Sequence, residues 1–165
     1  MKEYSDLRMH TAEHLLNRTV SVLLGCGRAF SSHIEKKKSK CDYRFSRDLT
    51  DSEKTEIEKR VNGAIKADLP VREDFISLAE AGKKFDLGRL PEGTGDTLRV
   101  ILIGDYDACP CIGKHVASTG EIGVFRMIST GFGNGVLRIR FKLAFMPQQT
   151  RCAQAAKLDE KPGSS

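Results

Sequence analysis

Two short motifs, far apart in the sequence, constrain this chain more than any other feature. His10 and His14 are four positions apart, and Cys111 and His115 repeat that spacing. Residues four apart on a helix lie on the same face, so the first pair can converge on one point. Three imidazole nitrogens and one thiolate form a donor set suited to tetrahedral zinc. The sequence therefore predicts one zinc site that joins the beginning of the chain to a segment near its far end.

Composition narrows the class of protein further. The chain has 165 residues, enough for one domain with a buried core, and no apolar run approaches the roughly 20 residues of a membrane span. Lys2, Glu3 and Arg8 interrupt any secretory signal, and five cysteines, an odd number, argue against a disulfide framework. We therefore expect a cytoplasmic protein with no membrane partner. The formal net charge of +5 favours a polyanionic partner such as RNA, with an ordinary solvated surface as the alternative.

Apolar periodicity and capping signals predict an α+β fold, in which a largely antiparallel sheet packs against helices. Helices are expected at 5–24, with Ser5 as N-cap, between a capping box at 50–53 and Pro70, and from a second capping box at 77–80 to about residue 85. Strands are expected at 29–35, 41–46, 71–76, 98–103, 123–129 and 136–145, with 98–103 central in the sheet and a turn at 131–135. We expect one domain over 1–147 and a partly disordered tail over 148–165.

The order of the motifs resembles the editing domain of alanyl-tRNA synthetases. In that family the paired histidines come first, the Cys-x-x-x-His pair follows, and the sequence TGEIG, here Thr119–Gly123, comes soon afterwards. The editing domain of threonyl-tRNA synthetases shares the first two motifs, but TGEIG favours the alanine branch. The resemblance extends over about residues 7–145. It implies a threonyl/alanyl-tRNA synthetase editing-domain-like fold and makes 1–147 a zinc-dependent tRNA-editing domain.

The resemblance also implies an activity. The chain has no room for an aminoacylation domain, so it is similar to the short, free-standing AlaX-type trans-editing proteins. These are hydrolases that deacylate tRNA(Ala) wrongly charged with serine, and sometimes with glycine. Two departures from the family pattern concern the second motif: Cys109 stands where a polar or acidic residue is common, and Ile112 stands where many members carry glycine. We favour Cys111 over Cys109 as the ligand because only Cys111 has the four-residue spacing to His115.

Further site residues are expected around the zinc. Glu13, between the two histidines, is a candidate general base, with a helix-surface glutamate as the alternative. It also completes a pattern known from some zinc proteases, but that interpretation leaves Cys111 and His115 without a role. Selecting serine over alanine needs a fixed polar partner for one hydroxyl. In short AlaX proteins a threonine in the strand after the first helix supplies it, and counting along that strand places Ser31 there, followed by Ser32.

The tRNA contacts are expected at the polar tip between the first two strands. The candidates are Lys36, Lys37 and Lys38, together with Arg44 in the following strand, since lysine and arginine neutralise phosphates. A solvated tip is the alternative. The leading function is a zinc-dependent trans-editing hydrolase; the second is a non-catalytic, zinc-stabilised RNA-binding module. The sequence leaves both open because four protein ligands close the zinc shell, as in structural sites.

Overall fold

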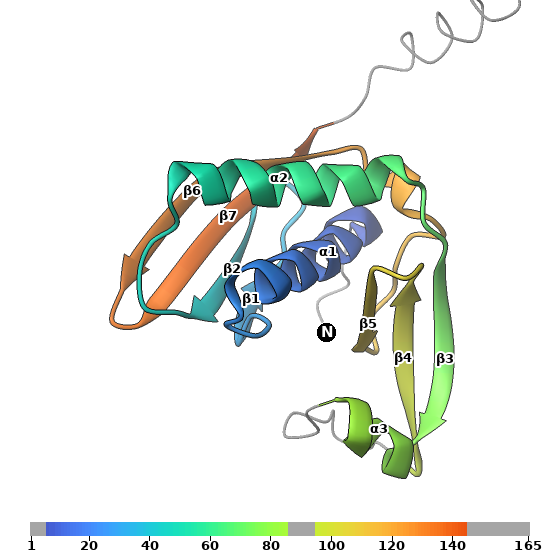
Figure 1. Cartoon of the computed structure of the whole chain (residues 1–165). Helices are drawn as coiled ribbons and strands as arrows, with labels where there is room; N and C mark the ends of the chain where they lie inside the picture. The colour runs from blue at the N-terminus through green and yellow to red at the C-terminus, as the bar shows by residue number, and fades with distance from the viewer. Residues whose placement is uncertain (1–5, 86–94, 145–165) are drawn as a thin grey trace, which may run out of the picture.

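The computed structural model describes residues 6–85 and 95–144 and has the expected α+β architecture (Figure 1). The antiparallel strands form two sheets rather than the one that we predicted. The helices are α1 (Leu7–Leu24), α2 (Asp51–Lys66) and α3 (Leu78–Lys84), with a short 3₁₀ helix η1 (Thr119–Glu121). The four-stranded sheet has the order β1 (Ser31–His33), β2 (Ser39–Arg44), β7 (Val136–Ala144) and β6 (Val124–Gly133). The three-stranded sheet has the order β3 (Val71–Ser77), β4 (Thr97–Ile103) and β5 (Asp107–Pro110).

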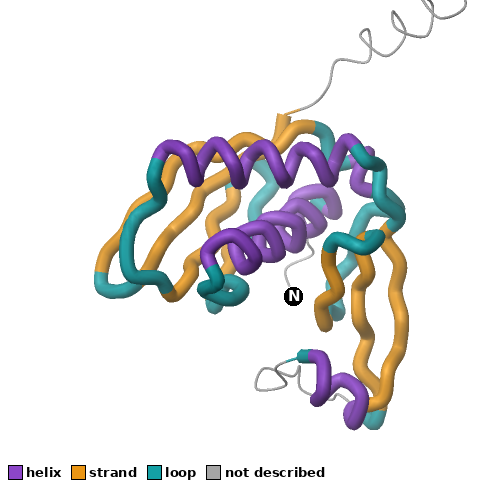
Figure 2. The backbone as a smooth tube through the Cα atoms, in the orientation of Figure 1, coloured by secondary structure: helices purple, strands orange, loops and turns teal. Residues whose placement is uncertain are grey.

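Helix α1 lies between the two sheets and carries the first motif (Figures 1 and 2). Its N-cap is Asp6, whose carboxylate accepts hydrogen bonds from the backbone of Arg8 and Met9; our prediction of Ser5 was wrong by one residue, and Ser5 lies outside the described residues. The helix ends as predicted at Gly25, whose φ of 68° suits glycine. None of the described helices is long and apolar enough to cross a membrane.

Helix α2 begins where its capping box predicts. The Thr50 hydroxyl accepts from the backbone of Glu53, and the Glu53 carboxylate accepts from the backbone of Thr50. The helix runs beside β6, where the Asn62 side chain exchanges two hydrogen bonds with the backbone of Phe125 at 2.8 and 2.9 Å. Together with the Met127 backbone N–H, which donates to Glu58 at 3.0 Å, this clamp satisfies backbone groups along the open side of an edge strand.

The four-stranded sheet alternates buried and solvent-facing residues along β2 and β7. On β7, Leu137, Ile139 and Phe141 are completely buried and face the helices. The residues between them, Arg138 and Arg140, therefore face the opposite side of the sheet. β6 runs to Gly133, so the turn is shorter than the predicted 131–135. It consists of Asn134 and Gly135, whose positive φ angles of 52° and 75° are typical of a tight hairpin turn.

The three-stranded sheet confirms that the apolar segment beginning at Leu98 is central, because β4 pairs with β3 on one side and β5 on the other. We did not predict β5, which is short and ends in Pro110. Proline lacks a backbone donor and is tolerated only at a sheet edge. β5 nevertheless has a decisive position, since it delivers Cys111 to the flank of α1.

The TGEIG segment joins the two halves of the fold. The buried hydroxyl of Thr119 donates to the Ala64 carbonyl of α2 and accepts from the backbone of Leu69. Gly120 approaches the Asp68 carboxylate so closely that an added Cβ would lie 2.3 Å from its oxygen. The motif is therefore structural: it fixes the end of α2 against the segment that follows His115. The predicted tail over 148–165 lies outside the described residues.

Candidate metal centre

The four predicted metal-ligating side chains meet at one point. One ligand atom from each of His10, His14, Cys111 and His115 lies within 4.8 Å of the others. The α1 histidines, on successive turns, are buried at 6% and 4% exposure, whereas Cys111 and His115 are half-buried. Cys111 and His115 follow β5, so the site forms only when β5 packs against α1. The convergence predicted from spacing is present, and this group can hold a metal ion.

Hydrogen bonds fix which nitrogen of His10 faces the cluster. Its Nδ1 lies 3.0 Å from the backbone carbonyl oxygen of Lys114. A carbonyl only accepts, so Nδ1 carries the proton and Nε2 keeps its lone pair. That Nε2 lies 3.5 Å from Cys111 Sγ, at the centre of the group. His10 is therefore held in the tautomer that a metal ligand requires.

Thr11 does the same for His115. Its hydroxyl lies 3.1 Å from the Leu7 carbonyl, to which it donates, and 3.2 Å from the backbone nitrogen of Val116, from which it accepts. The hydroxyl proton is thus in use, and the His115 Nδ1 at 3.0 Å must be the donor in that contact. Nε2 of His115 is then unprotonated; it is buried and has no hydrogen-bond partner within the described chain. An orphaned buried acceptor aimed at a thiolate and two further imidazoles fits a bound cation.

Asp107, the first residue of β5, supports His14. Its carboxylate Oδ2 lies 3.6 Å from His14 Nδ1, and Arg28 holds the same carboxylate through contacts of 2.8 and 3.2 Å. A carboxylate behind a ligating imidazole orients the ring and increases its basicity in many metal sites. Because Nδ1 of His14 faces this carboxylate, Nε2 is the ring nitrogen available to a metal. Neither Asp107 nor Thr11 belongs to a ligand motif, so no pattern in the sequence indicated their roles.

The electrostatics favour a thiolate ligand. Burial alone raises the pKa of Cys111, but the surrounding imidazoles of His10, His115 and His14 outweigh burial and lower that pKa to about 3. Burial likewise opposes a charged His14, yet Asp107 and Cys111 raise its pKa to about 9. The backbone N–H of Gly113 also donates to Cys111 Sγ at 3.4 Å. The site therefore carries a negative sulfur inside a ring of imidazoles, the charge state in which cysteine binds zinc.

The loop from Cys111 to His115 has a fixed shape. The Arg99 side chain donates to the carbonyls of Cys111 and Gly113 at 2.8 and 2.9 Å. A Cβ on Gly113 would lie 2.3 Å from Cε1 of His10, so this position requires glycine. Ile112 is 74% exposed and points away from the group, so this departure from the family pattern leaves the ligands undisturbed. Cys109 is not part of the converging group; burial raises the pKa of its thiol to about 11.

A polar network lines one side of the cluster. Glu13 lies with its Oε2 3.9 Å from His10 Nε2, while its Oε1 accepts from Asn17 and from the Ser32 hydroxyl, each at 3.1 Å. Ser32 thus extends from β1 toward the metal ligands. Ser31 pairs with Asp42 and lies on the opposite face of the strand. Of the two serines, Ser32 is therefore the one on the side of the metal group, whereas we expected Ser31 there first.

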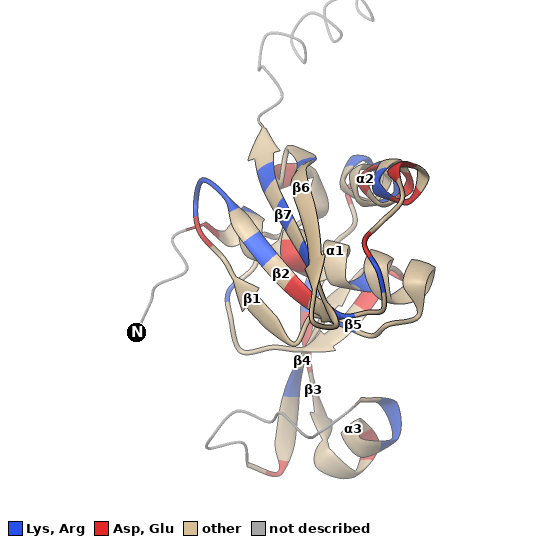
Figure 3. Ribbon diagram, turned by 90° about the vertical axis from the view of Figure 1, so that its left-hand side faces the viewer, with Lys and Arg blue, Asp and Glu red and all other residues tan. Residues whose placement is uncertain are grey.

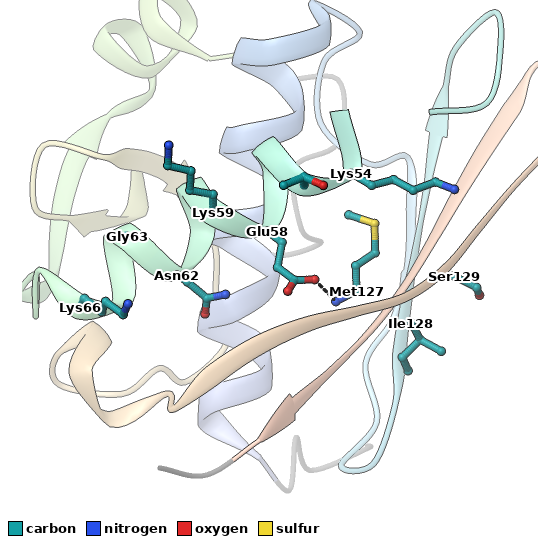
Figure 4. Close-up of a pocket in the computed structure, with 10 residues that line it drawn as sticks. Lys54, Glu58, Lys59, Asn62, Gly63, Lys66, Met127, Ile128 and Ser129 are labelled. Carbon is teal, nitrogen blue, oxygen red and sulfur yellow. Dashed lines mark hydrogen bonds between the residues drawn. The ribbon is translucent and has the colours of Figure 1, made fainter. Parts of the chain in front are cut away.

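The predicted tRNA-contacting residues lie away from the cluster. Lys36, Lys37 and Lys38 are exposed in the turn between β1 and β2. Arg44 is exposed at the end of β2, with its guanidinium 4.4 Å from the centre of the Phe30 ring. A separate groove of about 750 Å³ lies between α2 and β6 and includes Lys59 and Lys66 in its lining (Figure 4). No metal-cluster residue lines that groove.

Comparison with known proteins gives a consistent result. Residues 98–140 match the family described as the threonyl and alanyl tRNA synthetase second additional domain. The chain is 37% identical over 133 residues to the alanine–tRNA ligase of Treponema denticola, an alignment covering 79% of this chain and 22% of that ligase. It is 36% identical to the ligase of Fervidobacterium nodosum and 35% identical to that of Bacillus subtilis, covering 84% and 81% of this chain but 16% and 15% of those proteins. The chain thus spans about a fifth or less of the length of these curated relatives.

Proposed function

This chain is related to the second additional domain of threonyl- and alanyl-tRNA synthetases, and on that premise we propose that it is a zinc-dependent hydrolase of mischarged tRNA(Ala). Its main substrate is then Ser-tRNA(Ala), with Gly-tRNA(Ala) as a second one. The observation that carries the proposal is the convergence of three histidines and one cysteine within 4.8 Å. Relatedness alone would not distinguish an active domain from an inactive one, whereas a complete ligand group supports retained chemistry.

The donor set supports zinc as the metal. Imidazole nitrogen and thiolate together are typical of tetrahedral zinc sites, while magnesium and calcium prefer oxygen ligands. His10, His14, Cys111 and His115 would hold the ion, each histidine through Nε2. A zinc ion held there supplies a Lewis acid for the carbonyl oxygen of the aminoacyl ester.

The residues around the cluster would bind and orient the substrate. Glu13 presents a carboxylate beside His10, where it can accept a proton from an attacking water or bind the α-ammonium group of the aminoacyl end. Ser32, hydrogen-bonded to Glu13, can offer its hydroxyl to the side chain of a bound serine. Glu13 is half-buried beside the metal group, and Ser32, which is exposed on β1, contacts it. These positions support the two roles.

A second function has one observation in its favour. Four protein ligands leave no open coordination position, which is characteristic of structural zinc. Under this alternative the metal only ties α1 to the loop after β5, and the protein binds RNA without hydrolysing the ester. Replacement of one ligand by substrate, or expansion to five-coordination, would reconcile the four ligands with catalysis.

One experiment separates the two functions. The purified chain is incubated with Ser-tRNA(Ala), Gly-tRNA(Ala) and Ala-tRNA(Ala), and the decay of each aminoacyl ester is followed alongside the uncatalysed reaction. We expect fast loss of serine, slower or comparable loss of glycine, and retention of alanine. Zinc-loaded protein that binds these tRNAs but leaves all three esters intact supports the structural alternative. Equal rates on all three contradict the proposed selectivity.

A further inference from the structure

The solvent-facing side of the four-stranded sheet carries a concentration of positive charge. Alternation along β2 and β7 places Lys40, Arg138, Arg140 and Lys142 on the face opposite α1 and α2. We call these four side chains the outer basic face. In Figure 3, which shows the molecule from the left-hand side of Figure 1, blue lysine and arginine segments recur along β2 and β7. The face belongs to the same sheet as Ser32, so it adjoins the metal centre through β1.

The strand register makes this face unfavourable for the isolated fold. Lys40 lies directly opposite Arg140 on the neighbouring strand, and Lys142 lies directly opposite Arg126. Directly opposed like charges destabilise an antiparallel pair. Asp42 is the one acidic residue of β2 and β7. Its two carboxylate oxygens accept hydrogen bonds from the Arg138 guanidinium at 2.7 and 2.9 Å. Within the described residues, Lys40, Arg140 and Lys142 form no ion pair.

The same face also contains a small hollow of about 240 Å³. Its lining includes Lys38 from the hairpin tip, Lys40 from β2 and Arg140 from β7, together with His33, Ser39 and Glu35. Glu35 contacts His33 at 2.7 Å, and the three basic side chains outnumber this single carboxylate, so the hollow keeps a net positive charge. A site with converging lysine and arginine donors is suited to a phosphate group.

Unfavourable local arrangements, such as opposed like charges without an acidic partner, are typical of functional surfaces. Arg126 contacts Glu58 at 3.7 Å, so the opposed pair without an acidic partner among the described residues is Lys40–Arg140. This pair and the basic hollow can be explained together if an anionic polymer covers the sheet. We propose that the outer basic face binds the sugar–phosphate backbone of tRNA, and that the aminoacylated end crosses β1 to reach the metal centre. This inference rests on the proposed function for the identity of the polyanion. It moves the principal RNA contact from the hairpin tip, where the sequence alone placed it, to the sheet.

The route across β1 is short. β1 is an edge strand of three residues, paired only with β2. Its residue Ser32 contacts Glu13 beside the metal ligands, while its neighbour His33 lines the hollow on the other face. Consecutive residues of one strand thus border the reaction site and the RNA surface. The groove between α2 and β6 is the competing surface because it also contains lysines. Its lining comes from α2 and β6 and includes no residue of β1, whereas the hollow is lined by His33, the chain neighbour of Ser32.

The test compares three double variants that each remove two positive charges. Lys40→Gln/Arg140→Gln alters the outer basic face, Lys36→Gln/Lys37→Gln the hairpin tip, and Lys59→Gln/Lys66→Gln the α2 groove as a matched control. Binding of uncharged tRNA(Ala) is measured by fluorescence anisotropy between 50 and 200 mM salt. Each lost phosphate contact reduces the salt slope by about 0.7–0.9.

We expect the salt slope of the outer-face variant to fall by about 1.4–1.8. Raising the salt from 50 to 200 mM should then weaken tRNA binding by a factor roughly tenfold smaller in this variant than in the wild type. The groove control should bind like the wild type. Zinc content should be unchanged in all variants. The outer-face variant should unfold at the same temperature as the wild type or a higher one, because it loses a like-charge pair.

The proposal is overturned if the groove variant loses tRNA binding and the outer-face variant does not. It is also overturned if the outer basic face of the wild-type protein binds anionic lipid vesicles and not tRNA. The two proposals fail separately. A protein that binds tRNA through the outer basic face yet deacylates none of the charged tRNAs contradicts the proposed function alone. A protein that deacylates Ser-tRNA(Ala) with undiminished salt dependence in the outer-face variant contradicts the surface alone.

Discussion

Replacing Thr11 with valine tests whether hydrogen bonds behind the metal ligands determine metal affinity. Valine has the same shape as threonine but no hydroxyl. The Thr11 hydroxyl accepts from the backbone of Val116 at 3.2 Å and from Nδ1 of His115 at 3.0 Å. Thr11→Val therefore leaves two donors unpaired, one of them a backbone N–H in a buried setting. The variant also removes the group that fixes the tautomer and orientation of the His115 ring.

The expected magnitudes follow from these contacts. A buried donor without a partner costs about 1–3 kcal/mol. His115 is half-buried, so its unpaired Nδ1–H should cost about 1 kcal/mol, the low end of this range. Together with the unpaired backbone N–H of Val116, the metal-free protein should lose about 2–4 kcal/mol of stability. Loss of a hydrogen bond that orients a metal ligand typically weakens metal binding by about 10–100-fold. Thr11→Ser keeps the hydroxyl and should retain most of the affinity.

The assay is competition for zinc against a chromophoric chelator, with urea unfolding of the metal-free protein measured in parallel. Thr19→Val is the matched control because Thr19 is also buried in α1, and its hydroxyl bonds to Leu15 and Tyr106 rather than to a metal-site residue. It should lose stability and keep its zinc affinity. Wild-type zinc affinity in Thr11→Val would refute the reasoning, and a loss of stability alone would limit the hydroxyl to supporting the backbone.

Three further predictions concern the same site. Gly113→Ala should weaken zinc binding, measured by zinc titration, because its new methyl group would lie 2.3 Å from His10. Its control, Gly63→Ala on α2, has open space around it and should stabilise the protein by about 0.5–1 kcal/mol, measured by thermal unfolding. Ser32→Ala should reduce the ratio of deacylation rates on Ser-tRNA(Ala) and Ala-tRNA(Ala) more than Ser31→Ala does, and the reverse order would restore our first choice from the sequence. Removing zinc with a chelator should lower the unfolding temperature, since a ligand at 100 times its Kd contributes about 2.7 kcal/mol, and an unchanged temperature would argue against a bound metal.

Much of the candidate site could be predicted from the sequence because its signals are local. The spacing of His10 and His14 determines that both face one way on a helix, whatever else the chain does. The capping box at Thr50 likewise specifies where α2 begins, and alternation along 136–145 separates the buried face of β7 from the basic one. These patterns depend on residues within one or two turns or along one strand, so no knowledge of the remaining fold is needed.

Other features were decided only when distant segments met. Thr11 and His115 are 104 positions apart, and no pattern in either segment shows that a hydroxyl of one fixes the ring of the other. Asp107 gained its role because β5, a strand too short and proline-limited to recognise, lies against α1. A strand register shifted by one residue exchanges the two faces of a strand, which is why the choice between Ser31 and Ser32 required the pairing of β1 with β2. The sequence therefore determined which atoms can bind a metal, and the tertiary structure determined how those atoms are oriented and which side of the sheet presents its charge to a partner.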